Sequence, residues 1–263
     1  GAVLLLVEHL LRRLGQSPAR LKAFTLAVTD DNGRATGPDL EQARRFLRET
    51  ELEMLGEAIE VDAQAVDPWR AVAVIEDYKA LDVECAAVAL ALAEGIRARY
   101  PQWRYLIDGD GGDENLKDYP IEENRELTIR SVVGNSMLYQ EGWGVDAVKH
   151  SLTYSGGYSR GCVRTYAPLR QQGFVGFSPF TRPAVVAAAE AIPFDELSSG
   201  SHERLYGLKG EILARGILAV TGRTLPVFPK RRFQDGALPD ALRATRFAGD
   251  SGVYRRHFLA RFS

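Results

Sequence analysis

The sequence predicts an α/β fold: a doubly wound parallel sheet followed by a mainly helical C-terminal half. Three observations support this class. Short apolar runs alternate with stretches of helical length over residues 1–120, which is typical of parallel strands joined by crossover helices. The short apolar run at 21–28 is consistent with a parallel strand covered on both faces. The 263 residues, of which 45% are hydrophobic, suffice for a large core.

The first half of the chain supplies the strands. Residues 1–14 predict a helix that Gly15 closes, and the apolar run at 21–28 (LKAFTLAV) predicts a buried strand. A turn over 29–33 follows. Pro38 fits the first position of the next helix. Beyond the turn we expect, in order, a helix at 38–50, a strand at 58–61, helices at 68–78 and 83–99, and a strand at 104–107.

The strand signal fades after residue 120. Helices are expected there at 122–150, 182–192, 202–221 and 238–247. We therefore divide the chain into an α/β part, 1–120, and a helical part, 121–263, that packs on the sheet and completes a cleft. Aromatic residues and glycines crowd residues 137–180, which indicates irregular loops near a pocket. The tail at 254–258 reads as a helix that docks on the core.

Charge and cysteine content exclude several classes of protein. The net charge of -2 argues against a uniformly basic nucleic-acid binder, although residues 201–263 carry 12 Lys and Arg against 5 Asp and Glu, an excess of +7. The two cysteines, Cys85 and Cys162, form no CxxC motif, so neither a disulfide scaffold nor a cysteine zinc site is expected. The apolar start is broken by Glu8, too early for a membrane span, and we expect a cytoplasmic location.

The segment DGDGGDE at 108–114 carries the strongest chemical signal. It comes directly after the predicted strand at 104–107, and ligands of open α/β sheets bind beyond the carboxyl ends of strands. Glycines there let the backbone approach a ligand, and carboxylates there can hold Mg²⁺ with phosphate oxygens. An acidic surface turn is the alternative reading of this segment.

Four segments, in order, resemble the ATP-dependent domain of the asparagine synthetase family. DGDGGDE with DY at 118–119 is similar to the family's S-G-E-G-x-D-E…G-G-Y. FTL at 24–26 resembles its S-F-x-V strand, SPF at 178–180 its P-F-L-D region, and PKRRFQDG at 229–236 its R-x-K-x-x-F-x-D-G. The resemblance covers about residues 1–237 and implies an adenine nucleotide alpha hydrolase-like sheet.

The resemblance implies roles for seven residues. Asp108 and Gly109 would lie beside the nucleotide, and Leu26 would pack against adenine. Asp113 would bind Mg²⁺ and pyrophosphate oxygens. The nucleophile would be handled by Asp110, at the position of a family Glu. Two lysines are candidates for charge stabilisation: Lys230, because a fixed cation favours a transition state that spreads negative charge, and Lys209, for which an exposed helix face is an equal alternative.

The chain departs from the family pattern in two places. The S-G-G-x-D-S phosphate loop and the glutaminase domain are absent from the sequence, which starts with the helix that normally follows that loop. We expect the loop to lie upstream, since a sheet without its first strand would leave strand edges unpaired. In addition, Val175 and Phe177 replace an acid and an arginine. Arg160 and Arg164 could substitute for these groups, or could be ordinary surface charges.

These observations predict an ATP-dependent carbon–nitrogen ligase that uses ATP and Mg²⁺, releasing AMP and pyrophosphate. Its substrates would be a small-molecule carboxylate and ammonia or an amine, with a glutaminase domain or subunit as a nitrogen source, and neither nucleic acid nor membrane as a partner. Two alternatives stay open. One is a lactam- or peptide-forming tailoring ligase on the same scaffold, and the other is a non-catalytic module that binds a nucleotide or a partner.

Overall fold

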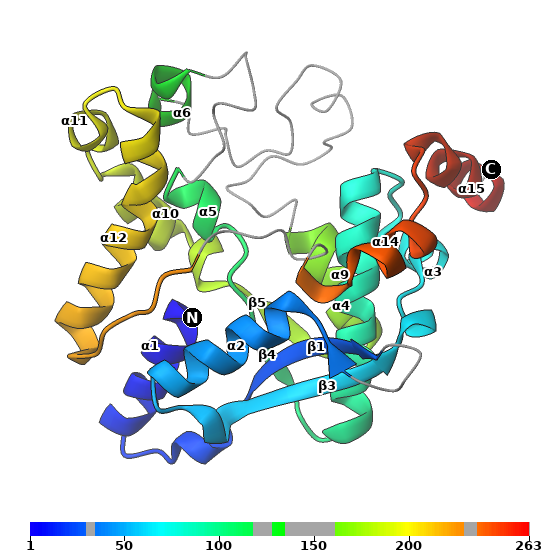
Figure 1. Ribbon diagram of the computed structural model, residues 1–263, viewed down its shortest axis with the longest axis horizontal. Coiled ribbons are helices and arrows are strands. Elements are labelled where there is room, and N and C mark those ends of the chain that lie inside the picture. The colour runs from blue at the N-terminus through cyan, green and yellow to red at the C-terminus, as the bar shows by residue number, and fades with distance from the viewer. Residues whose placement is uncertain (30–34, 118–127, 135–160, 229–235, 263) are drawn as a thin grey trace.

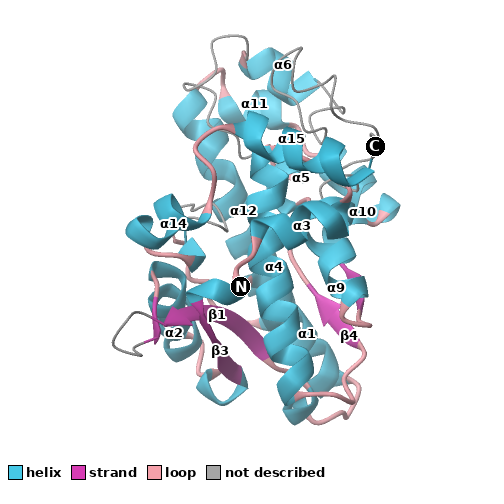
Figure 2. Ribbon diagram, turned by 90° about the vertical axis from the view of Figure 1, so that its right-hand side faces the viewer, coloured by secondary structure: helices cyan, strands magenta, loops and turns pink. Residues whose placement is uncertain are grey.

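Two small sheets, both in contact with one long buried helix, form the α/β part of the molecule (Figure 1). The computed structural model describes residues 1–29, 35–117, 128–134, 161–228 and 236–262. Helices dominate the remainder of these residues (Figure 2). The mixed α/β class is therefore confirmed. A single doubly wound sheet stays a prediction, because the described strands form two separate sheets.

The first sheet has the order β2-β1-β3. Strand β1 (Ala23–Thr29) pairs in parallel with β3 (Gly56–Asp62) along its whole length, and β2 (Ala35–Thr36) adds a short antiparallel pairing at its end. Helix α2 (Pro38–Glu49) lies on one face, where its Leu47 occupies the space that a Cβ at Gly56 would need. Helix α4 (Ala80–Arg99) covers the other face, with Gly95 directly on Ile59. Both glycines permit close helix–sheet packing.

The second sheet consists of β4 (Tyr105–Ile107) and β5 (Val175–Phe177), paired in parallel. Strand β4 was expected and β5 was not, so the expected absence of strands after residue 120 is wrong at this place. Three residues are too few to show a strand pattern, and β5 exists through its pairing with a segment about seventy residues earlier. One face of this sheet is open: Tyr105, Ile107 and Val175 are 57%, 38% and 45% exposed.

Most expected helices are confirmed, with ends that differ by a few residues. The exception is 122–150, of which the structure describes α6 alone within residues 128–134. The helices not yet introduced are α1 (Ala2–Arg13), α3 (Pro68–Ile75), α5 (Gly112–Asn115), α6 (Ile129–Gly134), the π-helix η6 (Gly161–Tyr166), α9 (Ala167–Gln171), α10 (Pro183–Glu190), α11 (Phe194–Ser198), α12 (His202–Thr221), α14 (Asp240–Arg246) and α15 (Ser251–Phe262).

The main core draws on both halves of the sequence. Leu26 and Ile59 from the first sheet pack with the buried face of α4, and Leu169, Phe174 and Tyr254 join them from the second half. Helix α4 is buried nearly all round, as its apolar sequence predicts. Helix α15 docks on this core as expected. No helix among the described residues is both long enough and apolar enough to cross a bilayer.

Candidate functional site

The acidic segment lies where two parallel strands end together. Residues 108–115 follow β4, and the 3₁₀ turn Pro179–Thr181 with its cap Ser178 follows β5. The backbone N–H of Asp108 donates to the carbonyl of Phe177 at 3.2 Å, which continues the strand pairing into the turn. Because both carboxyl ends lie at one edge, side chains from both turns meet there. We call Asp108–Asp113 with Thr165, Tyr166, Ser178 and Lys209 the acidic corner.

Asp108 holds a carboxylate with one unused acceptor. Its Oδ1 accepts a hydrogen bond from the backbone N–H of Asp110 at 3.1 Å, whereas its Oδ2 is buried and has no hydrogen-bond partner among the described residues. Burial raises the pKa of Asp108 to about 7, and the nearby charge of Asp110 adds to the effect. The group therefore changes its protonation state near neutral pH, and its orphaned oxygen can accept a hydrogen bond or carry a proton.

Asp110 is fixed by groups from two other segments. The hydroxyl of Thr165, on η6, donates to its Oδ2 at 2.6 Å, and the hydroxyl of Ser178 donates to its backbone carbonyl at 2.7 Å. The Ser178 N–H in turn donates to the phenol oxygen of Tyr166 at 2.8 Å. The pKa of Tyr166 is raised, and burial of the phenol is the largest cause. Asp110 is thus held at its carboxylate by the Thr165 hydroxyl and at its backbone carbonyl by the Ser178 hydroxyl.

Sequence reasoning did not identify Thr165 and Tyr166 as site residues. They lie within the aromatic and glycine-rich stretch 137–180, and this composition was the one signal that pointed toward them. Their place at the corner depends on the pairing of β5 with β4. This pairing brings Ser178, which follows β5, within hydrogen-bond distance of Tyr166. No local pattern in the sequence encodes that pairing.

Helix α12 brings Lys209 to the acidic corner. Its Nζ lies 3.1 Å from Oδ1 of Asp113, and the two side chains are 23% and 40% exposed. Lys209 therefore belongs to the corner and is not a solvated helix charge. At Gly109 no atom of the described residues, apart from the glycine and its chain neighbours, lies within 4 Å of the place where a Cβ would stand, so these residues leave the backbone between the carboxylates open on that side.

Arg164 has a structural partner beside the corner. Its Nε lies 2.5 Å from Oδ1 of Asp82 on α4, and the side chains are 14% and 3% exposed. The reading of Arg164 as an ordinary surface charge is therefore wrong, because the pair is largely withdrawn from solvent. Cys85 lies on the same helix, and burial raises the pKa of its thiol to about 12. This cysteine is a packing residue, as expected.

One predicted site residue lies away from this corner, and another is outside the described residues. Leu26 is 3% exposed and lies in the main core between β1 and α4, where its side chain contacts other core residues. Its expected contact with adenine is therefore not supported by the structure. Lys230, the motif around it at 229–235 and the residues 118–119 lie outside the described residues, as does Arg160.

The donor set of the corner suits a magnesium–phosphate ligand better than a protein-only metal centre. Within the described ranges, no three His, Cys, Asp or Glu side chains converge on a point that could hold a metal ion. Mg²⁺ bound with a nucleotide needs only one or two carboxylates, because phosphates and water fill its other positions. Asp113, partly exposed and beside a lysine, meets that requirement. The orphaned oxygen of Asp108 gives a second acceptor.

Comparison with known protein families gives no match for this chain, and no curated protein matches it either.

Proposed function

We propose that the chain catalyses ATP-dependent amide-bond formation, in which ATP adenylates a carboxylate and ammonia or an amine then displaces AMP. The observation that carries the proposal is the acidic corner. A partly exposed Asp113 faces Lys209 of another helix, at the edge where β4 and β5 end. This edge is where open α/β sheets bind ligands. The four ordered segments that resemble the asparagine synthetase family give the reaction class.

Asp113 and Lys209 are proposed to hold the phosphates. Asp113 would provide the carboxylate for Mg²⁺, and Mg²⁺ supplies charge neutralisation on the phosphate oxygens when bound. Lys209 would exchange its contact with Asp113 for a contact with a phosphate oxygen, since an ammonium can rotate between nearby anions. Lys230 is proposed to add a second cation for the departing pyrophosphate.

Asp108 and Asp110 are proposed to manage the proton of the attacking nitrogen. Attack by a neutral amine forms the C–N bond and breaks the C–O bond to AMP. The nitrogen then carries one proton more than the amide product, and this proton must be removed. A carboxylate whose pKa is about 7 can accept such a proton at neutral pH. Asp110, held by hydrogen bonds from Thr165 and Ser178, would orient the amine.

The acceptor acid is proposed to differ from aspartate. The positions that carry an acid and an arginine in the family pattern are Val175 and Phe177, and both are strand residues of β5. An α-amino acid needs groups of both charges to hold it, and these side chains provide neither. This observation favours the second candidate, a lactam- or peptide-forming ligase on the same scaffold, whose acceptor would be less polar.

Pyrophosphate release by the full chain tests the proposal. With Mg-ATP, ammonium and a panel of carboxylates, we expect substrate-dependent release that falls at least about a hundredfold in Asp113→Ala and in Lys209→Ala, because each removes a charge placed on the phosphates. Arg215→Ala on the same helix as Lys209 is the matched control, since the Arg215 side chain is 80% exposed and pairs with Glu211, which is not part of the corner.

The outcomes separate the candidates. Release that responds to aspartate supports an asparagine-forming enzyme, and release that responds only to larger, less polar acids supports the tailoring ligase. ATP binding without release under any condition supports the non-catalytic module. Release that is unaffected by both Asp113→Ala and Lys209→Ala overturns the assignment of the acidic corner.

A further inference from the structure

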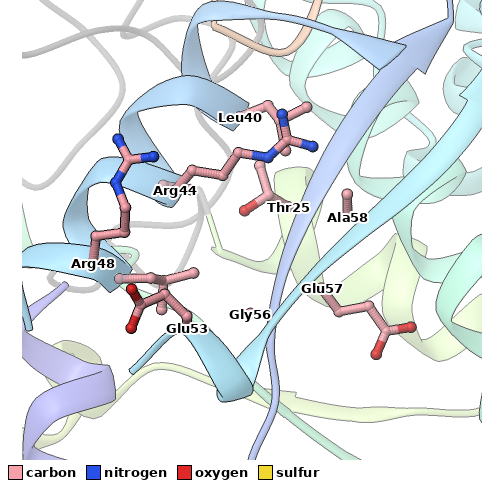
Figure 3. Close-up of a pocket in the computed structure, with 10 residues that line it drawn as sticks. Thr25, Leu40, Arg44, Arg48, Glu53, Gly56, Glu57 and Ala58 are labelled. Carbon is pink, nitrogen blue, oxygen red and sulfur yellow. The ribbon is translucent and has the colours of Figure 1, made fainter. Parts of the chain in front are cut away.

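A hollow lies between helix α2 and the first sheet, away from the acidic corner (Figure 3). Its volume is about 390 Å³, which is within the range of small-molecule sites. It is lined by α2, by the 3₁₀ turn at Glu53–Leu55 and by the first halves of β1 and β3, and it shares no residue with the corner. The lining residues are Thr25, Leu40, Ala43, Arg44, Leu47, Arg48, Glu53, Gly56, Glu57 and Ala58.

The hollow exists because small residues face α2 from the sheet. Side chains alternate between the faces of a strand, so Thr25 and its register partner Ala58 point to the same side as Gly56. Leu26 and Ile59 point to the opposite side, into the core with α4. Thr25 and Ala58 leave space that larger residues would fill, whereas Leu47 of α2 fills the space beside Gly56.

The sheet-facing stripe of α2 contains two arginines. Leu40, Ala43, Arg44, Leu47 and Arg48 follow the spacing i, i+3, i+4, i+7, i+8, which places them on one side of the helix. Leu40 and Leu47 are buried at the two ends of the stripe. A helix that packed tightly on the sheet would carry apolar residues at the other positions. Arg44 instead extends from α2 towards β1 over the hollow (Figure 3).

The charges around the hollow are unequal. Within the part of the chain that the structure describes, neither Arg44 nor Arg48 forms a salt bridge with a carboxylate, although the neighbouring Arg45 bonds Glu49 at 2.6 Å. The carboxylate of Glu57 points away from α2 and is bonded by Arg99 at 2.7 Å (Figure 3). Arg44 and Arg48, both exposed, therefore line the hollow with a single remaining carboxylate, that of Glu53, and of the two it is the Arg44 guanidinium that extends towards the sheet (Figure 3).

We propose that this hollow binds a small organic anion, a carboxylate or phosphate monoester carried on a compact apolar body. The two guanidinium groups would bind the anionic group, because arginine matches the planar, multiple oxygens of both anions. Leu40, Ala43 and Leu47 would contact the apolar body, and the Thr25 hydroxyl offers one hydrogen bond. The site is independent of the proposed ligase function, because none of its residues lies at the acidic corner.

Isothermal titration of the full chain tests the proposal with four probes: phenyl phosphate, benzoate, inorganic phosphate and the neutral benzyl alcohol. We expect a Kd below about 1 mM for phenyl phosphate or benzoate, weakening as salt is added, and no binding of benzyl alcohol. The better of the two anions identifies the anionic group. Inorganic phosphate should bind at least about tenfold more weakly than phenyl phosphate, because it lacks the apolar body.

Three variants assign the binding to the hollow. Arg44→Met/Arg48→Met keeps the apolar stems and removes both charges, and should weaken binding of the better anion at least about tenfold. Arg45→Met is the matched control on the next residue and should bind like the parent. Lys209→Ala should also bind like the parent, which excludes the acidic corner. Circular dichroism and the unfolding midpoint show whether each variant is folded, and the single variants Arg44→Met and Arg48→Met serve if the double variant is not.

The proposal fails on any of four results. The first is an equal affinity for benzyl alcohol and phenyl phosphate, and the second is an equal affinity of the parent and a folded Arg44→Met/Arg48→Met variant for the better anion. The third is a loss of binding in Lys209→Ala alone. The fourth is the absence of binding heat from either aromatic anion up to roughly 10 mM.

Discussion

The carboxyl of Asp108 combines three properties that seldom occur together: an orphaned oxygen, burial and a neighbouring carboxylate. Each disfavours the ionised form or leaves it unsatisfied, and burial is the largest cause of the raised pKa. Such a group reduces the stability of the folded protein when it is charged. That cost fits a residue kept for chemistry and not for folding, because perturbed carboxylates gather at functional sites.

Asp108→Asn is expected to stabilise the protein at neutral and alkaline pH. The pKa of Asp108 is about 7 in the folded state against 3.8 as its ordinary value, so the folded state holds the proton more tightly. Stability contributed by this proton is present below about pH 4 and is lost as pH rises toward about 7. The variant should therefore gain stability over the parent across that window, with a plateau on the order of 4 kcal/mol above it.

Urea unfolding at a series of pH values measures this difference. The exposed Glu60→Gln on β3 is the control, and its stability should differ from the parent by less than about 0.5 kcal/mol at every pH. A difference between Asp108→Asn and the parent that does not change with pH would show that the Asp108 carboxyl titrates at its ordinary value.

At the scale of elements, the acidic corner depends on how η6 and β5 meet α4 and β4. Arg164 of η6 and Asp82 of α4 form an ion pair in which both partners are nearly buried. The next residue, Thr165, donates to Asp110. The ion pair thus fixes the π-helix in the position from which Thr165 reaches the corner.

Arg164→Met is expected to lower the free energy of unfolding by about 3–5 kcal/mol, because it leaves the carboxylate of Asp82 buried and unpaired. The double variant Asp82→Asn/Arg164→Met should regain a substantial part of that loss, since neither charge remains. Urea unfolding measures both, and the exposed Arg170→Met on α9 should change stability by less than about 0.5 kcal/mol. Equal losses in the single and double variants would contradict the role of the ion pair.

The sequence predicted the helices and strands better than the contacts between them. The helices at 38–50, 83–99 and 202–221 carry buried apolar residues of their own, the first begins with Pro38 and the last is capped by Ser201, so local residues determine them. Strand β5 and the pair Arg164–Asp82 depend on contacts between segments far apart in the chain. The acidic corner shows the same division. DGDGGDE was recognised from its sequence, whereas Thr165 and Tyr166 needed the fold to bring them near it.

At the scale of the whole molecule, one surface is unusually apolar. Tyr105 and Val175 are register partners on β4 and β5, and they are 57% and 45% exposed beside Ile107. Adjacent exposed apolar residues on a short sheet favour association between copies. We therefore expect copies of the chain to associate through the open face of β4 and β5.

Tyr105→Thr/Val175→Thr is expected to reduce concentration-dependent self-association while it preserves β propensity. Light scattering over a range of protein concentrations measures the association. The free energy of unfolding should change by less than about 1 kcal/mol, because both side chains are largely solvated already. Leu218→Thr on α12 replaces a similarly exposed apolar residue on another element and should leave the association as it is in the parent. Unchanged scattering from Tyr105→Thr/Val175→Thr would assign the association to another surface.

Helix α4 also determines how the chain can be divided. Its buried residues touch Leu26 and Ile59 before it in sequence and Leu169, Phe174 and Tyr254 after it. A cut near residue 120 would strip one side of this helix and expose a stretch of alanine, valine and leucine to water. Neither of the two fragments would retain a hydrophobic core that is shielded from water. A split or circularly permuted form must therefore place its new ends in a surface connection that leaves α4 enclosed by both of its neighbourhoods.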